Sequence, residues 1–360
     1  MQLQVRTLDF SGQNIYAGID THKKSWQVSI YSDELYHKTF NQPPHPEVLH
    51  RYLCKHFPNA TYYSVYEAGF CGFWIHDRLQ SLGINNIVVN PADVPTTDKE
   101  KKQKTDRVDS GKLARQLRNG DLEAIYIHNR EMLEDRNLVR MRRTHVKEIT
   151  RYKNRIKSTL FFYGIEIPDS FTRNQSYWSN SFMKWLSKLK LYGDSGTMTL
   201  QFLIEHVKKL RKDLLEINRE IRKLSQNEYY RNRVKLLMSI NGIGLTTAMI
   251  ILTEIDNIHR FSNQEKLAAY VGLIPTSHSS GDRDVHGEMV NRGNRFLKSA
   301  ILESAWVAAR VDPVLHMEYI GYCRRMKKNK AIIRIARKLL NRINFVLKNQ
   351  VTYDDGTEKT

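Results

Sequence analysis

Cysteine is scarce in this chain: three residues occur among 360, at Cys54, Cys71 and Cys323. Their number is odd, they lie far apart, and no CxxC pair occurs, so the sequence argues against both a disulfide framework and a zinc site. A reducing cytoplasm is the expected compartment. Long apolar runs are also lacking, because none approaches the roughly 20 residues that a membrane helix needs. The first residues contain no apolar signal core, so we expect a soluble protein without a membrane partner.

Acidic residues are in short supply relative to basic ones. The chain carries 57 Lys and Arg against 38 Asp and Glu, a formal net charge of +19, and its pI is about 9.7. Such a surplus attracts polyanions and makes their binding salt dependent, so nucleic acid is the expected partner. A ribosome-associated or RNA-packaging protein would share this charge. The 41% hydrophobic content and the length of 360 residues are compatible with two or three domains.

The first third of the chain alternates between strand-like and helix-like segments. Three closely spaced segments rich in β-branched and aromatic residues favour an antiparallel meander. A β-α-β-α-β order follows and favours parallel pairing. Together these patterns predict an RNase H-like α/β domain over residues 13–130. The expected strands are 15–20, 25–31, 35–40, 62–67 and 87–90, and the expected helices are 46–56 and 73–82.

The rest of the chain is expected to be mostly helical. A charged helix over 133–160 carries one apolar stripe, formed by Leu138, Met141, Ile149, Ile156 and Leu160. A second helix has the alternating steps of four and three of a coiled coil, and should pair with the first helix or a second subunit. Its seam comprises Leu203, Val207, Leu210, Leu214, Ile217, Ile221 and Leu224. We expect a coiled-coil assembly region over 131–230, a helical domain over 231–350 with a basic amphipathic helix at 331–347, and a polar tail over 351–360.

Four carboxylates are the main chemical signal. Asp20 and Glu67 each end an apolar strand-like segment, at the kind of position where open α/β sheets place ligands. Asp106 and Asp109 are three residues apart, so a helix projects them from one side. Carboxylates, phosphate and water are the ligands that Mg²⁺ prefers, so the four acids favour phosphodiester chemistry with Mg²⁺. Two ordinary alternatives stay open, because Asp beside Lys or Arg is usually a solvated ion pair and strand ends are often exposed.

Residues 240–244, Ile-Asn-Gly-Ile-Gly, resemble the hairpin of a helix-hairpin-helix module. Gly242 and Gly244 permit a tight turn and a close approach of backbone N–H groups to phosphate, which favours sequence-independent contact with a duplex. A simple interhelical turn fits the same residues. Basic runs elsewhere either contact backbone phosphate or solvate a helix end. They contribute Arg292, Arg295, Arg324, Arg325, Lys327 and Lys328.

A loop-like stretch over 272–281 contains Ser279 and Ser280 next to a glycine. A loop serine can meet an incoming phosphate, but it is a poor nucleophile unless a base or a metal activates it. His278 and His286 flank the pair and could assist. Most such serines only satisfy hydrogen bonds in a turn, so this pattern alone is weak.

Taken in order along the chain, these segments resemble the bacterial insertion-sequence transposases of the DEDD type. That group includes the pilin-gene invertases and the bridge-RNA-guided recombinases, and the resemblance extends from about residue 15 to residue 347. The segments that carry it are Tyr16-Ala-Gly-Ile-Asp20, Tyr66-Glu-Ala-Gly69, Lys104-Thr-Asp-Arg-Val-Asp109, the 240–244 hairpin, Gly272-Leu-Ile-Pro275 and Ser279-Ser-Gly281.

The resemblance implies a RuvC-type metal tetrad formed by the four acids, and a DNA-attacking serine at Ser280, five residues after Pro275. The implied reaction links Ser280 to a DNA phosphate and frees a 3′ hydroxyl, which then attacks the partner's phosphoserine. Mg²⁺ would activate the serine and stabilise the leaving oxygen. Family members assemble as tetramers in which the acids of one subunit meet the serine of another, so a homo-oligomer, from dimer to tetramer, is implied. A structured noncoding guide RNA would pair with donor and target DNA duplexes, and the protein would act at the nucleoid of a bacterial cytoplasm.

Some positions depart from the commonest family pattern. Ser110 stands where many members have alanine, Glu67 is followed by Ala-Gly-Phe-Cys, and Ser279 leaves the nucleophile ambiguous by one position. The segment over 165–200 matches no pattern. Two rival functions stay open from the residues alone: a hydrolytic junction-resolving nuclease that uses the same acids with water, and a non-catalytic nucleic-acid-binding scaffold.

Overall fold

The computed structural model describes residues 9–97, 105–173, 176–280, 283–289 and 292–353, and gives only the backbone of 173, 275–280 and 283–289. Contacts divide the chain into two compact units, Met1–Ile127 and His128–Thr360, and each is described by itself. Lys104, Gly281 and most of the expected polar tail lie outside the described residues. The expected domains 131–230 and 231–350 fall within the second unit, so their separation stays a prediction.

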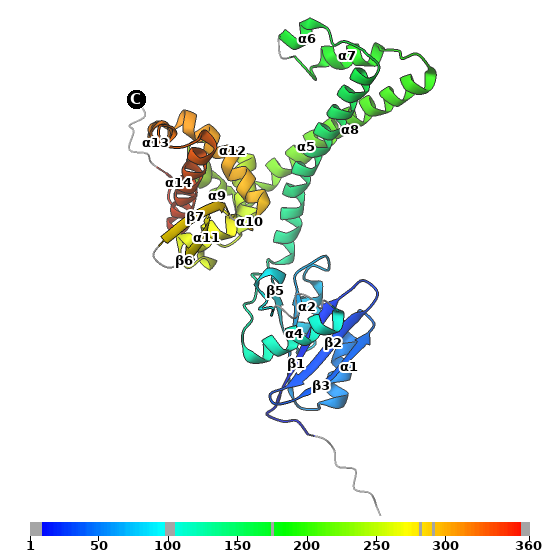
Figure 1. Ribbon diagram of the computed structural model, residues 1–360, viewed down its shortest axis with the longest axis vertical. Helices are drawn as coiled ribbons and strands as arrows, with labels where there is room; N and C mark the ends of the chain where they lie inside the picture. The colour runs from blue at the N-terminus through cyan, green and yellow to red at the C-terminus, as the bar shows by residue number, and fades with distance from the viewer. Residues whose placement is uncertain (1–8, 98–104, 174–175, 281–282, 290–291, 354–360) are drawn as a thin grey trace, which may run out of the picture. The chain divides into compact units, whose positions relative to one another are not determined.

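A five-stranded sheet with the order β3-β2-β1-β4-β5 forms the centre of the first unit (Figure 1). Strand β1 pairs antiparallel with β2 and parallel with β4. At the two edges, β3 is antiparallel to β2 and β5 is parallel to β4. The strands are β1 (Asn14–Thr21), β2 (Trp26–Ser32), β3 (Tyr36–Gln42), β4 (Thr61–Glu67) and β5 (Asn85–Val89).

Helices cover both faces of this sheet. Successive side chains of each strand point to opposite faces, and apolar residues occur on both. On one face, α1 (Pro46–His56) and α2 (Trp74–Ser81) pack against Ile15, Ala17 and Ile19 of β1. On the other face, α4 (Asp106–Asn119) places Leu113 against Val65 and Val89. A short turn, η1 (Pro91–Asp93), follows β5. The predicted sequence of three antiparallel strands and two further parallel strands is confirmed, with element ends shifted by one or two residues.

The first part of the second unit is built on two long helices, α5 (Arg130–Phe162) and α8 (Asp194–Leu224), which run side by side (Figure 1). Two short helices, α6 (Asp169–Arg173) and α7 (Asn180–Lys188), connect them. Phe182 and Leu186 of α7 pack with Leu160 of α5 and Leu200 of α8. The segment over 165–200, which matched no pattern in the sequence, therefore closes a small core at one end of the helix pair.

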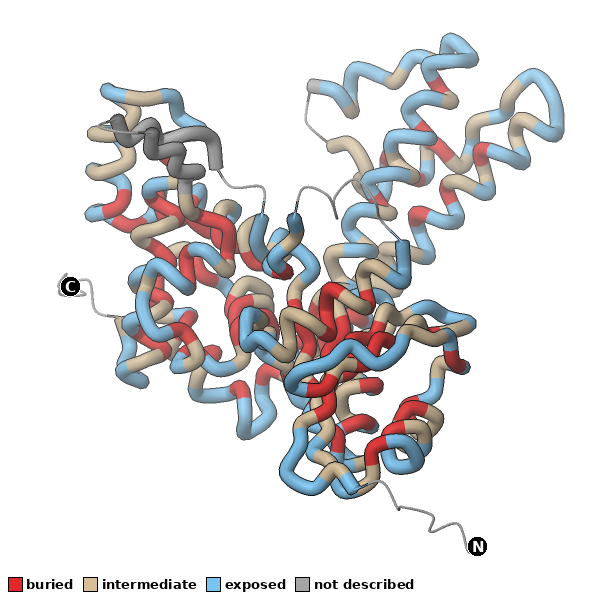
Figure 2. Tube along the Cα trace, turned by 60° about the horizontal axis from the view of Figure 1, so that its bottom comes forward, coloured by how far each residue is buried: buried red, intermediate tan, exposed pale blue. Residues whose placement is uncertain are grey.

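The apolar stripe predicted on α5 is only partly right. Ile149, Ile156 and Leu160 are buried, but the side chain of Met141 is 50% exposed and Val139 is buried instead. Residues two positions apart on an α-helix differ by ~200° around its axis, so Met141 lies on nearly the opposite side of α5 from Val139. Buried residues, red in Figure 2, are sparse along both long helices.

The predicted seam was expected to pair with the first long helix or with a second subunit. In the structure α8 packs along the first long helix, α5. Val207, Ile217 and Ile221 are buried. The other four seam positions, Leu203, Leu210, Leu214 and Leu224, are half-buried. The packing of α8 along α5 is thus established, while coiled-coil geometry and a role in subunit assembly stay predictions.

The remaining helices enclose the larger core of the second unit. The predicted basic amphipathic helix is confirmed as α14, which buries Ile335, Leu339 and Ile343. Among the helices that the structure describes, none is both long and apolar enough to cross a bilayer. The elements are α9 (Glu228–Met238), α10 (Leu245–Ile255), η2 (Ile258–Arg260), α11 (Gln264–Val271), β6 (Pro275–Ser280), β7 (Arg283–Met289), α12 (Arg295–Val311), α13 (Pro313–Cys323) and α14 (Lys328–Asn349).

The loop expected over 272–281 is wrong for most of its length. Residues 275–280 form strand β6, which pairs antiparallel with β7 in a two-stranded sheet. Ser280 is the last residue of β6 and faces Arg283 across the pair. Polar residues such as Ser and His give a weak strand signal, and here cross-strand hydrogen bonding supplies what local propensity does not.

The turn between α9 and α10 has the tight geometry that its glycines suggested. Gly242 has a φ of +94°, and a Cβ at this position would lie 2.8 Å from backbone atoms of α12. Gly244 precedes the first residue of α10 and caps it without a side chain. The backbone therefore requires glycine at 242, while the helix-hairpin-helix assignment and its contact with DNA stay predictions.

Candidate active site

Two of the four acids are brought together by parallel strand pairing. Tyr16 and Gly18 of β1 lie opposite Tyr63 and Val65 of β4, and the two tyrosine rings stack with their centroids 5.5 Å apart. Continuing this register places Asp20 and Glu67 at the carboxyl ends of neighbouring parallel strands. Both acids share the face that α4 covers, as period-two alternation requires.

The other two acids occupy the first turn of α4. Thr105 caps the helix by accepting a hydrogen bond from the Val108 N–H at 3.3 Å, and Asp106 and Asp109 follow within that turn. Carboxylates are favourable there because the helix dipole presents positive charge at its N-terminus.

Helix α4 lies directly on β1, because Gly18 has no side chain. A Cβ at Gly18 would lie 2.2 Å from the Ser110 carbonyl oxygen and 2.4 Å from the Ala114 nitrogen, both backbone atoms of α4. Gly18 is two residues before Asp20 on the same face of β1. The absence of a Cβ therefore brings the first turn of α4 close to the end of the strand.

A histidine that the sequence interpretation overlooked links two of the acids. The His22 Nε2 lies 3.2 Å from Asp20 Oδ2 and 3.4 Å from Asp106 Oδ2. One donor atom from each of these three residues lies within 4.8 Å of the others. Period-two alternation puts His22 on the same face as Asp20, so the spacing could have revealed it.

A buried lysine, also overlooked, links the other two acids. Lys112 Nζ lies 3.5 Å from Asp109 Oδ1 and 3.9 Å from Glu67 Oε1, and its side chain is 8% exposed. A buried ammonium group is costly without opposite charge, which these carboxylates supply. Lys112 follows Asp109 by three residues on α4, and that helical spacing was the available signal.

The negative charges of the cluster affect one another. Burial raises the pKa of Asp20, the carboxylates of Asp106 and Asp109 raise it further, and His22 opposes this effect. Like charges held together at the end of a sheet favour binding of a cation, which relieves both their repulsion and their desolvation.

The donor set fits a divalent metal. Adjacent ligand atoms around an octahedral cation such as Mg²⁺ lie about 3 Å apart, given metal–oxygen distances of ~2.1 Å. The contacts of His22 with Asp20 and Asp106, at 3.2 and 3.4 Å, approach that spacing. Glu67 and Asp109 lie outside this group of ligand atoms and form a second pair, which Lys112 bridges.

Ser110, where many members of the resembled family have alanine, has a structural role. Its Oγ lies 2.9 Å from Ser29 Oγ, which in turn lies 2.6 Å from Thr39 Oγ1. Ser29 and Ser110 are fully buried. This hydroxyl chain ties α4, which carries two of the acids, to β2 and β3.

The remaining candidate residues belong to the second unit. Ser280 and Ser279 are backbone positions in β6, and the register pairs Ser277 with His286 and His278 with Val285. Arg292 and Arg295 are exposed on either side of Gly293. The turn between α13 and α14 exposes Arg324, Arg325, Lys327 and Lys328 together.

Two family models match the chain. One, described as transposase and specific for the DEDD type of IS110 elements, covers residues 17–165, which include all four acids. The other, described as the transposase IS116/IS110/IS902 family, covers residues 234–320, which include the hairpin and Ser280.

Similar proteins from several bacteria share much of the chain. The putative transposase y4rJ of Sinorhizobium fredii is 28% identical over 305 residues, 79% of this chain and 76% of its own length. The transposase for insertion sequence element IS1533 of Leptospira borgpetersenii is 26% identical over 258 residues, 70% of this chain and 72% of its own. The transposase for insertion sequence element IS1111A of Coxiella burnetii is 23% identical over 294 residues, 80% and 78% of the two chains.

The contact of Gly18 with α4 predicts a sharp difference between two glycine substitutions. Gly18→Ala forces a methyl group into the backbone of α4 and should lower the free energy of unfolding by roughly 1–3 kcal/mol. Gly111→Ala is the matched control, because a Cβ there meets only Ser29 Oγ at 3.7 Å. It should leave stability unchanged or raise it by about 0.5–1 kcal/mol through better helix propensity. Urea denaturation measures both, and equal effects would contradict the packing described.

Proposed function

The chain belongs to the DEDD-type transposases of bacterial insertion sequences, and we propose that it exchanges DNA strands by Mg²⁺-dependent attack of Ser280 on a phosphodiester. The observation that carries this proposal is the cluster of carboxylates on two parallel strand ends and one helix turn, joined by His22 and Lys112. A family of DNA-recombining enzymes makes phosphodiester chemistry the expected use of such a cluster.

The four acids are the proposed holders of the metal. Asp20, Glu67, Asp106 and Asp109 would supply hard oxygen ligands, and phosphate oxygens of DNA would complete the shell. When bound, Mg²⁺ supplies positive charge that stabilises the attacking and leaving oxygens of an in-line displacement. The residues themselves orient the DNA phosphate, and Lys112 keeps Glu67 and Asp109 in place.

The proposed covalent step conserves atoms as follows. The Ser280 hydroxyl attacks phosphorus and loses its proton, the bond from phosphorus to the 3′ oxygen breaks, and that oxygen leaves as a 3′ hydroxyl. The DNA is then joined through its 5′ phosphate to Ser280. A 3′ hydroxyl from the partner strand attacks this phosphoserine, forms a new phosphodiester and restores the serine hydroxyl. Bond energy is retained in the phosphoserine, so no external energy source is needed.

Charge and family resemblance support the proposed partners. The net charge of +19 suits donor and target duplexes, and the exposed cations between α13 and α14 suit contact with their phosphates. A structured noncoding bridge RNA would select both DNA sequences by base pairing. A dimer or tetramer would let acids of one subunit act with the serine of another, at the nucleoid of the bacterial cytoplasm.

One rival uses the same site. A hydrolytic junction-resolving nuclease would hold metal on the same acids and use water as the nucleophile, so the acids do not distinguish it from strand exchange. It would leave no protein on the cleaved DNA, which makes the covalent product the decisive observation.

Ser280→Ala should abolish the covalent protein–DNA product, since it removes the attacking oxygen. The measurement uses the full-length protein with the RNA that co-purifies with it, a plasmid carrying the element, and Mg²⁺, with the adduct detected as a peptide retained on DNA after proteolysis. Asp20→Asn should lower adduct formation by at least ~100-fold while the protein stays folded, because a metal ligand is lost.

Ser279→Ala is the matched control, one residue away in the same strand, and should form the adduct. An adduct that persists in Ser280→Ala and disappears in Ser279→Ala would transfer the nucleophile to Ser279. Cleavage by the wild-type protein with no peptide on the DNA would favour the hydrolytic rival.

The turn between α13 and α14 should contribute to salt-dependent DNA binding. The Lys327→Ala/Lys328→Ala variant is expected to reduce the slope of log K against log salt by about 1.8, or ~0.9 for each lost phosphate contact. The matched control is Arg51→Ala/Lys55→Ala, which removes the same charge from exposed positions of α1. Titration of a short DNA duplex of arbitrary sequence measures both, and equal slopes for the two variants would exclude a specific role for the turn.

A further inference from the structure

The two ends of the β6–β7 hairpin meet at a pair of glycines. Gly272 precedes the hairpin with a φ of +80°, and Gly293 follows it with a φ of +129°. A Cβ at Gly272 would lie 2.5 Å from the Arg292 carbonyl oxygen, and one at Gly293 would lie 2.6 Å from the Gly272 backbone. No side chain fits between these two segments, so the chain enters and leaves the region of β6 and β7 at closely spaced points.

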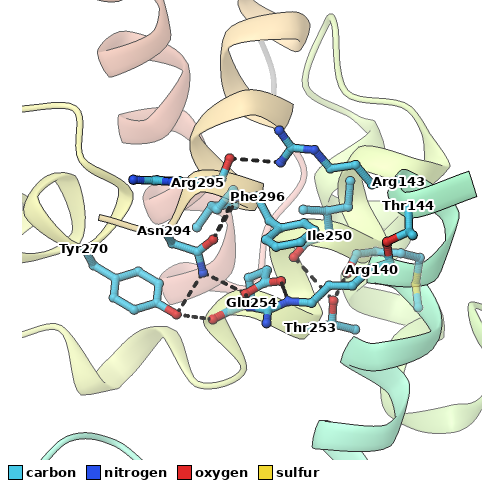
Figure 3. Close-up of polar contacts among 12 residues, drawn as sticks. Arg140, Arg143, Thr144, Ile250, Thr253, Glu254, Tyr270, Asn294, Arg295 and Phe296 are labelled. Atoms are coloured by element: carbon cyan, nitrogen blue, oxygen red, sulfur yellow. Dashed lines mark hydrogen bonds and ion pairs between the residues drawn. The ribbon is translucent and has the colours of Figure 1, made fainter. Parts of the chain in front are cut away.

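Asn294 follows Gly293, and both the oxygen and the nitrogen of its side-chain amide form hydrogen bonds. Its Oδ1 caps α12 by accepting hydrogen bonds from the Phe296 and Leu297 N–H groups at 3.1 and 3.0 Å. Its Nδ2 donates to Glu254 Oε2 at 2.7 Å and to the Tyr270 hydroxyl at 3.2 Å (Figure 3). Its backbone N–H donates to the Tyr270 carbonyl at 2.8 Å. The start of α12, just after the hairpin, is therefore held from several directions at Asn294.

Glu254 connects Asn294 to the long helix α5 through hydrogen bonds with Arg140. Its side chain is 1% exposed, and its two oxygens accept hydrogen bonds from Arg140 Nε at 2.6 Å and Nη2 at 2.7 Å. Arg143, one turn further along α5, donates to the Arg295 carbonyl at 3.0 Å. Both guanidinium groups lie over the ring of Phe296, at 4.6 and 4.9 Å from its centroid. Figure 3 shows these side chains converging from α5, α10 and the start of α12.

Glu254 accepts one more hydrogen bond than the neutralisation of its buried charge requires. A buried carboxylate must be paired, but the pairing of Glu254 with Arg140 already satisfies its charge. The additional bond from Asn294 selects one orientation of the segment that leaves the hairpin. Ion pairs of this geometry restrict conformation, and the segment restricted here lies between α12 and the two-stranded sheet whose first strand ends at Ser280.

We propose that Asn294 and Glu254 are positioning residues for the serine reaction: together with Arg140 they fix the base of the β6–β7 hairpin, so that Ser280 meets the DNA phosphate in line. This inference rests on the proposed function of Ser280. Neither residue touches DNA, and each acts through the orientation of the hairpin. Misplacement of a reacting group by about 1 Å can cost ~100-fold in rate, so the anchor affects the covalent step and not DNA affinity.

The Asn294→Asp variant tests this role with little change of shape. The new carboxylate still caps α12, but it replaces the donor to Glu254 with a second negative charge. Asn263→Asp is the matched control, because Asn263 caps α11 through Lys266 N–H at 2.9 Å and lies at an exposed position. Glu254→Gln in the Asn294→Asp background restores a donor opposite the carboxylate and provides a rescue.

The experiment uses the full-length protein with its co-purified RNA, the plasmid-borne element and Mg²⁺, and follows the single-turnover rate of the covalent adduct at saturating DNA. We expect Asn294→Asp to slow this rate by about 10- to 100-fold with unchanged DNA affinity, the double variant to recover at least part of it, and Asn263→Asp to match the wild type. Melting curves establish which fraction of each variant is folded at the assay temperature.

A purely structural role predicts another result. In that case Asn294→Asp would lower the melting temperature, but its rate per folded molecule would equal that of the wild type, and this outcome overturns the proposal. If Asn294→Asp does not fold, Asn294→Ser keeps the cap without the amide or the charge, and a wild-type rate in that variant also overturns it. A wild-type protein that forms no adduct at all contradicts the function of Ser280 instead, so the two failures are distinguishable.

Discussion

The direct packing of α4 on β1 at Gly18 is the contact on which the acid cluster depends. Two of the acids come from strand ends and two from a helix that is distant along the chain, and only the separation of helix and sheet decides whether they meet. The missing side chain of Gly18 sets that separation, and the buried hydroxyls of Ser29 and Ser110 maintain it. His22 and Lys112 then each contact one strand acid and one helix acid. A glycine that carries no chemistry thus controls the geometry of the residues that do.

Much of the first unit could be predicted from the sequence because its signals are local. Alternation of apolar residues identified the strands, and their spacing indicated which pairs were parallel. The acids were predicted from their position at strand ends and their spacing on a helix. His22 and Lys112 were missed because each has a common bland interpretation, as a polar turn residue and as one lysine among many. Their spacing from Asp20 and Asp109 was the available signal, and the three-dimensional contacts show that both face carboxylates.

The second unit was less predictable where tertiary contacts override local preference. The polar segment around Ser280 forms a strand only because β7 supplies hydrogen-bond partners. Met141 was placed on the apolar stripe of α5, whereas Val139 holds the buried position. The network of Arg140, Glu254 and Asn294 joins residues that are 114 and 40 positions apart, and no pattern in the sequence indicates it. Such long-range polar pairing depends on the assembled fold.

The central claim is that Asp20, Glu67, Asp106 and Asp109 share a bound divalent metal. The most direct measurement is a crystal structure of the full-length protein soaked in Mn²⁺, a scattering substitute for Mg²⁺, with anomalous difference maps. The account predicts a peak within ligand distance, about 2.0–2.6 Å, of oxygens from Asp20 and Asp106, with Glu67 and Asp109 in the same cluster. A fully loaded crystal with no peak at these oxygens, or with peaks only elsewhere, would contradict it.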